Sequence, residues 1–162
     1  NNKILYKKII KLRNLGSEVK HVHKEIGINS RLDSIQASIL LEKIKYLNNL
    51  NNKRKKIAKF YDRKIKNKKI SFVNYSKNSV YHQYVILVKN RNSLIKLLKK
   101  NKISYGIHYP KPLNKLYCFK KLFTKKKYPN SEAFASKCLS LPIDPYLNKK
   151  EITKIIKILN SF

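Results

Sequence analysis

The sequence predicts an α/β protein in which short strands alternate with amphipathic helices. Three observations lead to this prediction: a long helical pattern from about Asp33 to Ile65, a strand–helix–strand unit from Val80 to Tyr109, and a final helix that ends near Leu159. The 162 residues suffice for one domain of ordinary size, or for one small domain plus part of another. No apolar run approaches the ~20 residues that cross a bilayer, so no association with a membrane is expected.

The N-terminal third is expected to contain two helices joined by a polar segment. The first runs from Lys3 to Leu15, and Gly16 ends it where a left-handed residue is needed. Residues 16–28 are expected to be irregular. Asp33 lies in the first turn of the long second helix, where a negative charge suits the helix dipole. Asn is a weak helix former, so the Asn-rich residues 48–52 predict a bend.

After Lys66 the spacing of apolar residues changes, and short strands and helices are expected to alternate. Segments dense in Val, Ile and Tyr favour strands. Asn148 and Glu151 form a capping pair for the final helix. The buried face of that helix is expected to comprise Ile152, Ile155, Ile156 and Leu159. The remaining expected elements are strands at 70–73, 80–88 and 103–109, helices at 93–100 and 131–139, and an extended stretch at 141–145.

The strongest compositional feature is a net charge of +31, from 39 Lys and Arg against 8 Asp and Glu. A basic chain invites the interpretation of a lysine-rich nucleic-acid-binding module. However, only five of the basic residues are Arg, whose planar fork suits phosphate and guanine. Lys, Asn and Ile are abundant together, and all three have AT-rich codons. Genome composition therefore explains the charge better, and no specific nucleic-acid partner is expected.

The cysteines and histidines predict neither a disulfide framework nor a metal site. Cys118 and Cys138 are too few for either and suit a reducing cytoplasm, which is the expected location. His21 and His23 form a His-x-His with no carboxylate or Cys at ligand spacing. His82 is expected to pack in a strand beside tyrosines. The three glycines form no phosphate-binding fingerprint.

Four segments carry a resemblance that composition does not. In order along the chain they read LRNLG at 12–16, GINSRLDSIQA at 27–37, YHQYV at 81–85 followed by GIHYPKPL at 106–113, and LSLPIDP at 139–145. Each is weak alone. Together, in this order and spacing over nearly the whole chain, they resemble the DegT/DnrJ/EryC1/StrS family of sugar aminotransferases.

This resemblance implies the C-terminal part of a type I aminotransferase fold that depends on pyridoxal 5'-phosphate. Residues 1–50 would form the end of the large domain and the interdomain helix, and residues 51–162 the small α+β domain. The whole enzyme would be a homodimer that transfers an amino group from an amino-acid donor, glutamate by expectation, to a nucleotide-linked keto sugar. Such reactions serve polysaccharide and deoxyamino-sugar biosynthesis. A few relatives with this fold are dehydratases.

The same resemblance implies roles for four residues. Asn29 and Arg31 lie in the family's N-x-R segment and would contact the cofactor phosphate, Asn29 across the subunit interface. The alternative for Asn29 is a turn residue, and the alternative for Arg31 is a cation that is solvated or packs against a helix. His108 and Tyr109 would face the nucleotide sugar, and His108 could instead be a structural histidine at a strand end. The family's motif reads PLH where this chain has Pro112, Leu113 and Asn114, so Asn114 stands in place of a histidine.

No residue of this chain matches the family's cofactor lysine or the aspartate that pairs with the pyridine nitrogen, because both lie upstream of the matching segments. We therefore assign no catalytic residue, and we expect the chain to be inactive alone. The absence of an initiator Met at Asn1 also suggests a fragment. A degenerate partner subunit or a pseudogene product are further interpretations.

Overall fold

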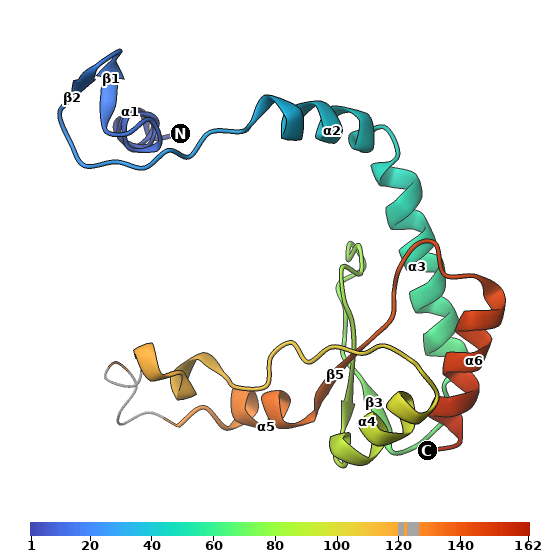
Figure 1. The fold of residues 1–162 in the computed structure, drawn as a ribbon. Helices are drawn as coiled ribbons and strands as arrows, with labels where there is room; N and C mark the ends of the chain where they lie inside the picture. The colour runs from blue at the N-terminus through green and yellow to red at the C-terminus, as the bar shows by residue number, and fades with distance from the viewer. Residues whose placement is uncertain (120–121, 123–126) are drawn as a thin grey trace. The chain divides into compact units, whose positions relative to one another are not determined.

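The computed structural model describes residues 1–119, 122 and 127–162, which form two compact units: residues 1–47 and residues 48–162. Figure 1 shows the elements in chain order, and each unit is described by itself. The assignment of residues 1–50 to the end of a large domain and of residues 51–162 to a small domain stays a prediction.

The N-terminal unit contains two helices and a small hairpin. In order these are α1 (Lys3–Arg13), β1 (Ser17–Val19), β2 (Val22–His23) and α2 (Ser34–Ile44). The expectation that residues 16–28 are irregular was wrong, because β1 and β2 pair as antiparallel strands. Helix α1 ends at Arg13, two residues before the predicted end at Leu15, and Gly16 has the expected left-handed φ, 75°, as does Leu15 at 59°. Neither helix has a buried residue within this chain.

The predicted long helix is two helices, and the predicted bend was misplaced. The helical pattern is interrupted at Lys45 and Tyr46, whose N–H groups bond to carbonyls three residues back. The Asn-rich residues 48–52 instead form the start of α3 (Leu47–Lys64). Helix α3 is anchored farther along by buried Ile57, Ala58 and Tyr61, and this packing outweighs a propensity cost of a few tenths of a kcal/mol per Asn.

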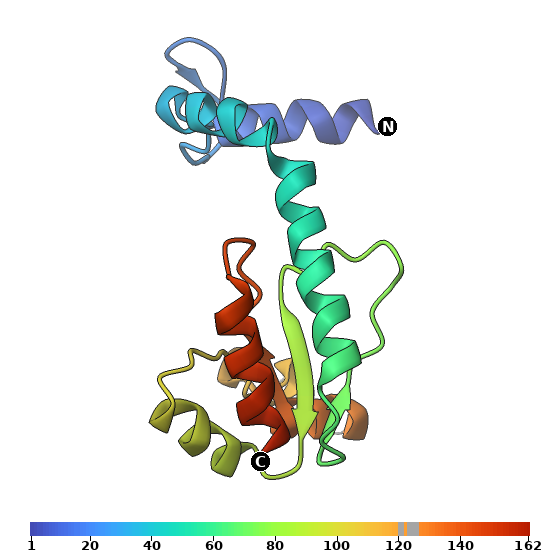
Figure 2. The same ribbon diagram turned by 90° about the vertical axis from the view of Figure 1, so that its right-hand side faces the viewer.

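The C-terminal unit is built on a three-stranded antiparallel sheet in the order β3–β4–β5. Helices α3 and α6 lie side by side on one face of the sheet, and α5 lies on the other (Figures 1 and 2). After α3, the elements of this unit are β3 (Ile70–Phe72), β4 (Tyr84–Val88), α4 (Arg91–Lys100), the 3-10 turns η1 (Leu113–Lys115) and η2 (Tyr117–Phe119), α5 (Pro129–Lys137), β5 (Cys138–Leu141) and α6 (Lys149–Asn160).

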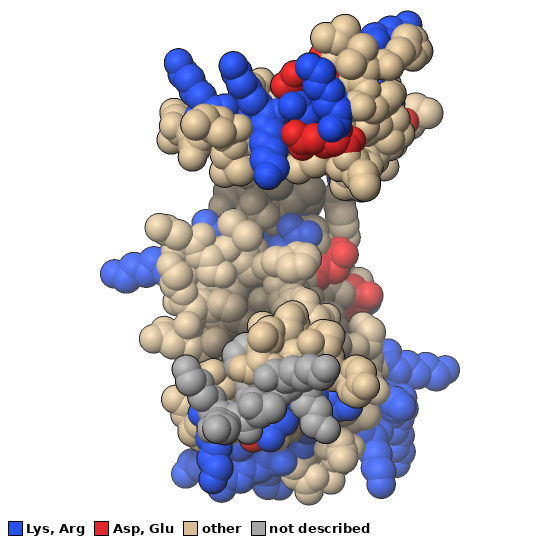
Figure 3. Space-filling model, turned by 90° about the vertical axis from the view of Figure 1, so that its left-hand side faces the viewer, with Lys and Arg blue, Asp and Glu red and all other residues tan. Residues whose placement is uncertain are grey.

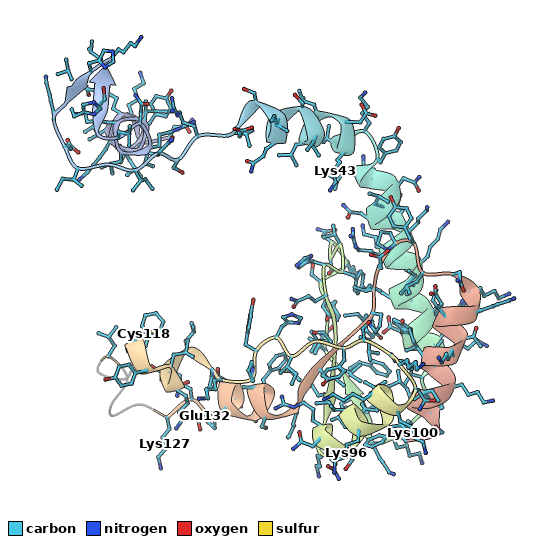
Figure 4. All side chains as sticks on the ribbon, viewed as in Figure 1. Lys43, Lys96, Lys100, Cys118, Lys127 and Glu132 are labelled. Atoms are coloured by element: carbon cyan, nitrogen blue, oxygen red, sulfur yellow. The ribbon has the colours of Figure 1, made fainter. Side chains whose placement is uncertain are left out.

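The hydrophobic core lies between this sheet and its helices. Helix α4 buries Leu94 and Leu98, and its Lys96 and Lys100 are exposed (Figure 4). The prediction for α6 is confirmed in full, because the capping box of Asn148 and Glu151 is present. The four buried residues of α6 are those expected: Ile152, Ile155, Ile156 and Leu159.

One strand prediction and one helix prediction in the C-terminal unit were wrong. Residues 103–109 form no strand, and only Gly106 makes an isolated bridge, to Ser140. The helix expected to continue to residue 139 ends at Lys137, and the next four residues form β5. Strand β5 pairs with β4 along one edge, and at its other edge only the bridge between Ser140 and Gly106 forms, so residues 103–109 add no strand to the sheet.

Basic side chains project from both units, and acidic ones are few (Figure 3). Among the described residues, no helix is long and apolar enough to cross a membrane. The same residues include no group of three or more His, Cys, Asp or Glu placed to hold a metal ion.

Candidate functional site

Asn29 and Arg31 lie in the N-terminal unit on a segment that backbone hydrogen bonds tie to the end of α1. Asn29 forms an isolated bridge with Asn14, and the N–H of Ser30 donates to the carbonyl of Arg13 at 2.9 Å. The N–H of Ile28 donates to the carbonyl of Leu12 at 2.8 Å. These bonds fix the backbone on both sides of Asn29.

Two glycines permit this close backbone approach. A Cβ on Gly27 would lie 2.2 Å from the backbone nitrogen of Gly16 and 2.5 Å from the carbonyl oxygen of Leu12. A Cβ on Gly16 would lie 1.7 Å from the carbonyl oxygen of Glu25, and the φ of 75° favours glycine there as well. Any other residue would therefore push the segment that carries Asn29 away from α1.

Ion pairs add a second connection between α1 and the hairpin. The ammonium of Lys11 lies 3.1 Å from a carboxylate oxygen of Glu18 and 3.4 Å from one of Glu25. The hydrogen bond with Glu18 is the main reason why the pKa of Lys11 is raised. Exposed pairs of this kind stabilise weakly, so the glycine contacts dominate the local geometry.

The side chains of Asn29 and Arg31 are exposed and turned toward each other. Nε of Arg31 donates to Oδ1 of Asn29 at 3.1 Å. This bond leaves the Asn29 amide nitrogen and both terminal guanidinium nitrogens of Arg31 without a partner among the described residues. Unpaired N–H donors on neighbouring side chains are the groups that bind a phosphate, so the pair fits the phosphate of the expected cofactor.

His108 and Tyr109 lie in the C-terminal unit at the rim of a cavity of about 560 Å³. The cavity is enclosed by the segment from His108 to Leu116 and by α5, through Phe134 and Ala135. Tyr109 is 70% exposed, whereas His108 is half-buried. The walls of this cavity are mainly apolar, and Lys111 is among the residues that line it. A mostly apolar lining with a few polar groups is usual for a small-molecule site.

Asn114, which replaces the histidine of the family's motif, holds this segment against α5. Its amide nitrogen donates to Oε1 of Glu132 at 3.1 Å, and the ammonium of Lys115 lies 3.4 Å from the same oxygen. The hydrogen bond from Asn114 is the largest cause of the lowered pKa of the Glu132 carboxyl. Asn114 therefore has a structural contact in this chain; Glu132 is labelled in Figure 4.

The sequence did not predict the residues that support His108. Oγ of Ser140 lies 2.8 Å from Nδ1 of His108, and Ser140 comes from β5, a strand that was not expected. The exposed His82 precedes β4, which begins at Tyr84, so it is not the packed strand residue that was expected. The LSLP segment at 139–142 could have indicated a role for Ser140, because this small polar residue lies between two apolar residues.

Comparison with known proteins gives a consistent result. The model of the DegT/DnrJ/EryC1/StrS aminotransferase family matches residues 1–160. A transaminase of Aneurinibacillus thermoaerophilus, named for dTDP-3-amino-3,6-dideoxy-alpha-D-galactopyranose, is 35% identical over 164 residues, which is 100% of this chain and 45% of the relative. The chain thus spans somewhat less than half the length of this curated relative.

Solved structures agree with the family match. DesV of S. venezuelae has a TM-score of 0.89 at 28% identity, over 99% of this chain and 44% of that chain. The sugar aminotransferase Spr1654 of Streptococcus pneumoniae, in its PLP form, has a TM-score of 0.83 at 26% identity over 98% and 43%. These matches confirm the α/β aminotransferase fold. The chain belongs to the DegT/DnrJ/EryC1/StrS aminotransferase family.

Proposed function

We propose that this chain is part of an aminotransferase that uses pyridoxal 5'-phosphate to move an amino group from an amino acid to a nucleotide-linked keto sugar. The observation that carries the proposal is the cavity beside His108 and Tyr109, in a chain that matches the family over residues 1–160. The dTDP-sugar named for the 35% identical relative supports this substrate class.

The cavity suits a nucleotide sugar in its shape and chemistry. Leu113, Leu116 and Phe134 offer apolar surface for a sugar or base face. Lys111 places a positive charge at the edge, where it would attract a diphosphate. His108 provides a polar ring nitrogen that can hydrogen-bond an oxygen of the ligand. The cavity therefore offers a contact for each chemical part of the substrate.

Asn29 and Arg31 would contribute to holding the cofactor. Their unpaired N–H donors suit a phosphate, and we propose that in a homodimer of the whole protein they contact the cofactor phosphate of the partner subunit. When bound, the cofactor supplies the electron sink that amino transfer requires. The lysine that holds the cofactor has no counterpart among these 162 residues, so the chain by itself is proposed to be inactive.

A titration with a dTDP-linked sugar tests the substrate proposal. We expect the chain to bind it, and His108→Asn to weaken binding roughly tenfold, because one hydrogen bond to the ligand is lost. His21→Asn is the matched control, since His21 is an exposed histidine of the other unit and Asn tolerates its φ of 67°. Equal effects of the two substitutions would contradict the proposal.

A mixed dimer tests the cofactor contact in the whole protein. Asn29→Ala should lower cofactor affinity about ten- to a hundredfold, the loss of one hydrogen bond to a charged group, about 1.5–3 kcal/mol. An Asn29→Ala subunit that keeps its cofactor lysine is paired with a subunit that lacks the lysine but keeps Asn29. The one remaining site should bind the cofactor with wild-type affinity. Affinity as weak as in the Asn29→Ala homodimer would place the contact within one subunit.

A further inference from the structure

The imidazole of His108 is held by two residues that lie on separate segments of the C-terminal unit. Nδ1 of His108 lies 2.8 Å from Oγ of Ser140, which is only 5% exposed. Ser140 and Gly106 exchange two backbone hydrogen bonds, of 2.8 and 3.0 Å. A Cβ on Gly106 would lie 2.5 Å from Cε1 of His108, so the ring packs directly against this bridge.

The other ring nitrogen of His108 is open to solvent. Nε2 has no hydrogen-bond partner among the described residues. In this part of the chain, the one buried side-chain nitrogen or oxygen without a partner is Nε of Arg91. Nε2 of His108 is therefore unpaired but not enclosed, so it is free to contact a ligand in the hollows that His108 lines, among them the cavity beside Tyr109.

The position of the proton follows from the hydrogen-bonding capacity of Ser140. Its buried hydroxyl can donate one proton, and Nδ1 of His108 is its one side-chain or backbone contact among the described residues. If Nδ1 carried the proton, the serine hydroxyl would accept it and its own proton would be left buried without an acceptor, which is costly. If the hydroxyl donates to Nδ1, both groups are satisfied, and the imidazole proton resides on Nε2.

We propose that Ser140 is a positioning residue that holds neutral His108 in the tautomer protonated at Nε2, so that the imidazole presents an N–H donor to the cavity. Such a donor requires an accepting oxygen on the ligand, and the anionic oxygens of a nucleotide-sugar diphosphate are the strongest acceptors of that substrate. The tautomer assignment stands on the geometry alone, and only the identity of the ligand rests on the proposed function.

The tautomer can be read directly by nitrogen-15 NMR of the histidine rings in the ligand-free chain. His23 is an internal reference of the opposite kind, because its Nδ1 lies 2.9 Å from the carbonyl oxygen of Leu15, which can only accept. We expect the Nε2–H tautomer for His108 and the Nδ1–H tautomer for His23. An Nδ1–H tautomer for His108 in the wild-type chain would overturn the proposal, and this measurement requires no variant.

Ser140→Ala then tests the positioning role, with Ser136→Ala as the matched control. Ser136 is an exposed serine whose hydroxyl donates to the carbonyl of Ala133 and does not contact His108. Ser140→Ala should convert His108 to a mixture of tautomers and weaken binding of dTDP-glucose about three- to tenfold, whereas Ser136→Ala should change neither. An unchanged tautomer in Ser140→Ala would overturn the positioning role. The two results can also differ. If His108 has the Nε2–H tautomer only when Ser140 is present, but the chain does not bind dTDP-glucose, the positioning role is supported and only the proposed ligand is overturned.

Discussion

Gly27→Ala should separate the segment that carries Asn29 from α1. The added Cβ would lie 2.2 Å from the nitrogen of Gly16, 2.5 Å from the oxygen of Leu12 and 2.7 Å from the carbonyl carbon of Leu15. All three are backbone atoms, so no side chain can rotate to make room. The backbone must move, and the hydrogen bonds that flank Asn29 must lengthen or break.

The size of the effect follows from the bonds at risk. They are Leu15 N–H to Ile28 C=O at 3.1 Å, Ile28 N–H to Leu12 C=O at 2.8 Å and Ser30 N–H to Arg13 C=O at 2.9 Å. At about 1 kcal/mol each, their loss lowers the free energy of local opening by about 3 kcal/mol. Amide exchange at positions 28 and 30 should then accelerate roughly a hundredfold.

Hydrogen exchange with residue resolution measures this effect. The amides of the central strand, Tyr84–Val88, should keep their wild-type rates, because the second unit is not perturbed. Ser30→Ala is the matched control, since it alters an exposed neighbouring side chain and keeps the same backbone bonds. Unchanged exchange at positions 28 and 30 in Gly27→Ala would refute the argument that this glycine maintains the close approach.

Three further predictions concern the stability and charge of the chain. Asn148→Ala removes the capping box of α6 and should lower the free energy of unfolding by about 1 kcal/mol in a denaturant titration, whereas Asn90→Ala, at an N-cap without a side-chain bond, should have little effect. Burial, assisted by a hydrogen bond to Asp62, raises the pKa of Tyr84 above its ordinary value of 10.0, so the stability from the protonated phenol is fully present below pH 10 and is lost as the pH rises above it. Stability measured from pH 9 upward should therefore fall less steeply in Tyr84→Phe than in the wild type, and an identical slope would show that this phenol is not responsible. If the lysines reflect genome composition, affinity for DNA should be weak, independent of sequence and nearly abolished by salt in a binding titration; selective binding at physiological salt would favour the nucleic-acid module instead.

Local patterns were sufficient where an element depends mainly on its own residues. The final helix illustrates this, because its capping box and its apolar face both follow from positions within one segment. The left-handed backbone at Gly16 is similar, since glycine adopts a positive φ without strain, although α1 itself ends earlier, at Arg13. The family motifs could also be recognised from the sequence, because recognition required only their residues, their order and their spacing along the chain.

Strand pairing could not be predicted in the same way, because a strand is stabilised by a partner that lies elsewhere in the sequence. The helix expected at 131–139 would include the first two residues of β5, yet residues 138–141 form a strand because they pair with the edge of β4. Residues 103–109 have the composition of a strand, but only Gly106 bridges to Ser140 at the edge of β5, so no strand forms there. The break at Lys45 rather than in the Asn-rich segment depends likewise on the packing of α3.

The sequence by itself determined the family and, through its motifs, the candidate residues Asn29, Arg31, His108 and Tyr109. It also determined the order of most helices, because these depend on apolar spacing and local capping. Only the tertiary structure brought Ser140 within 2.8 Å of His108, and it did so through β5, a strand that the local pattern did not predict. A hydrogen bond between residues 32 positions apart is set by the pairing of β5 with β4 and with Gly106, which no local pattern encodes.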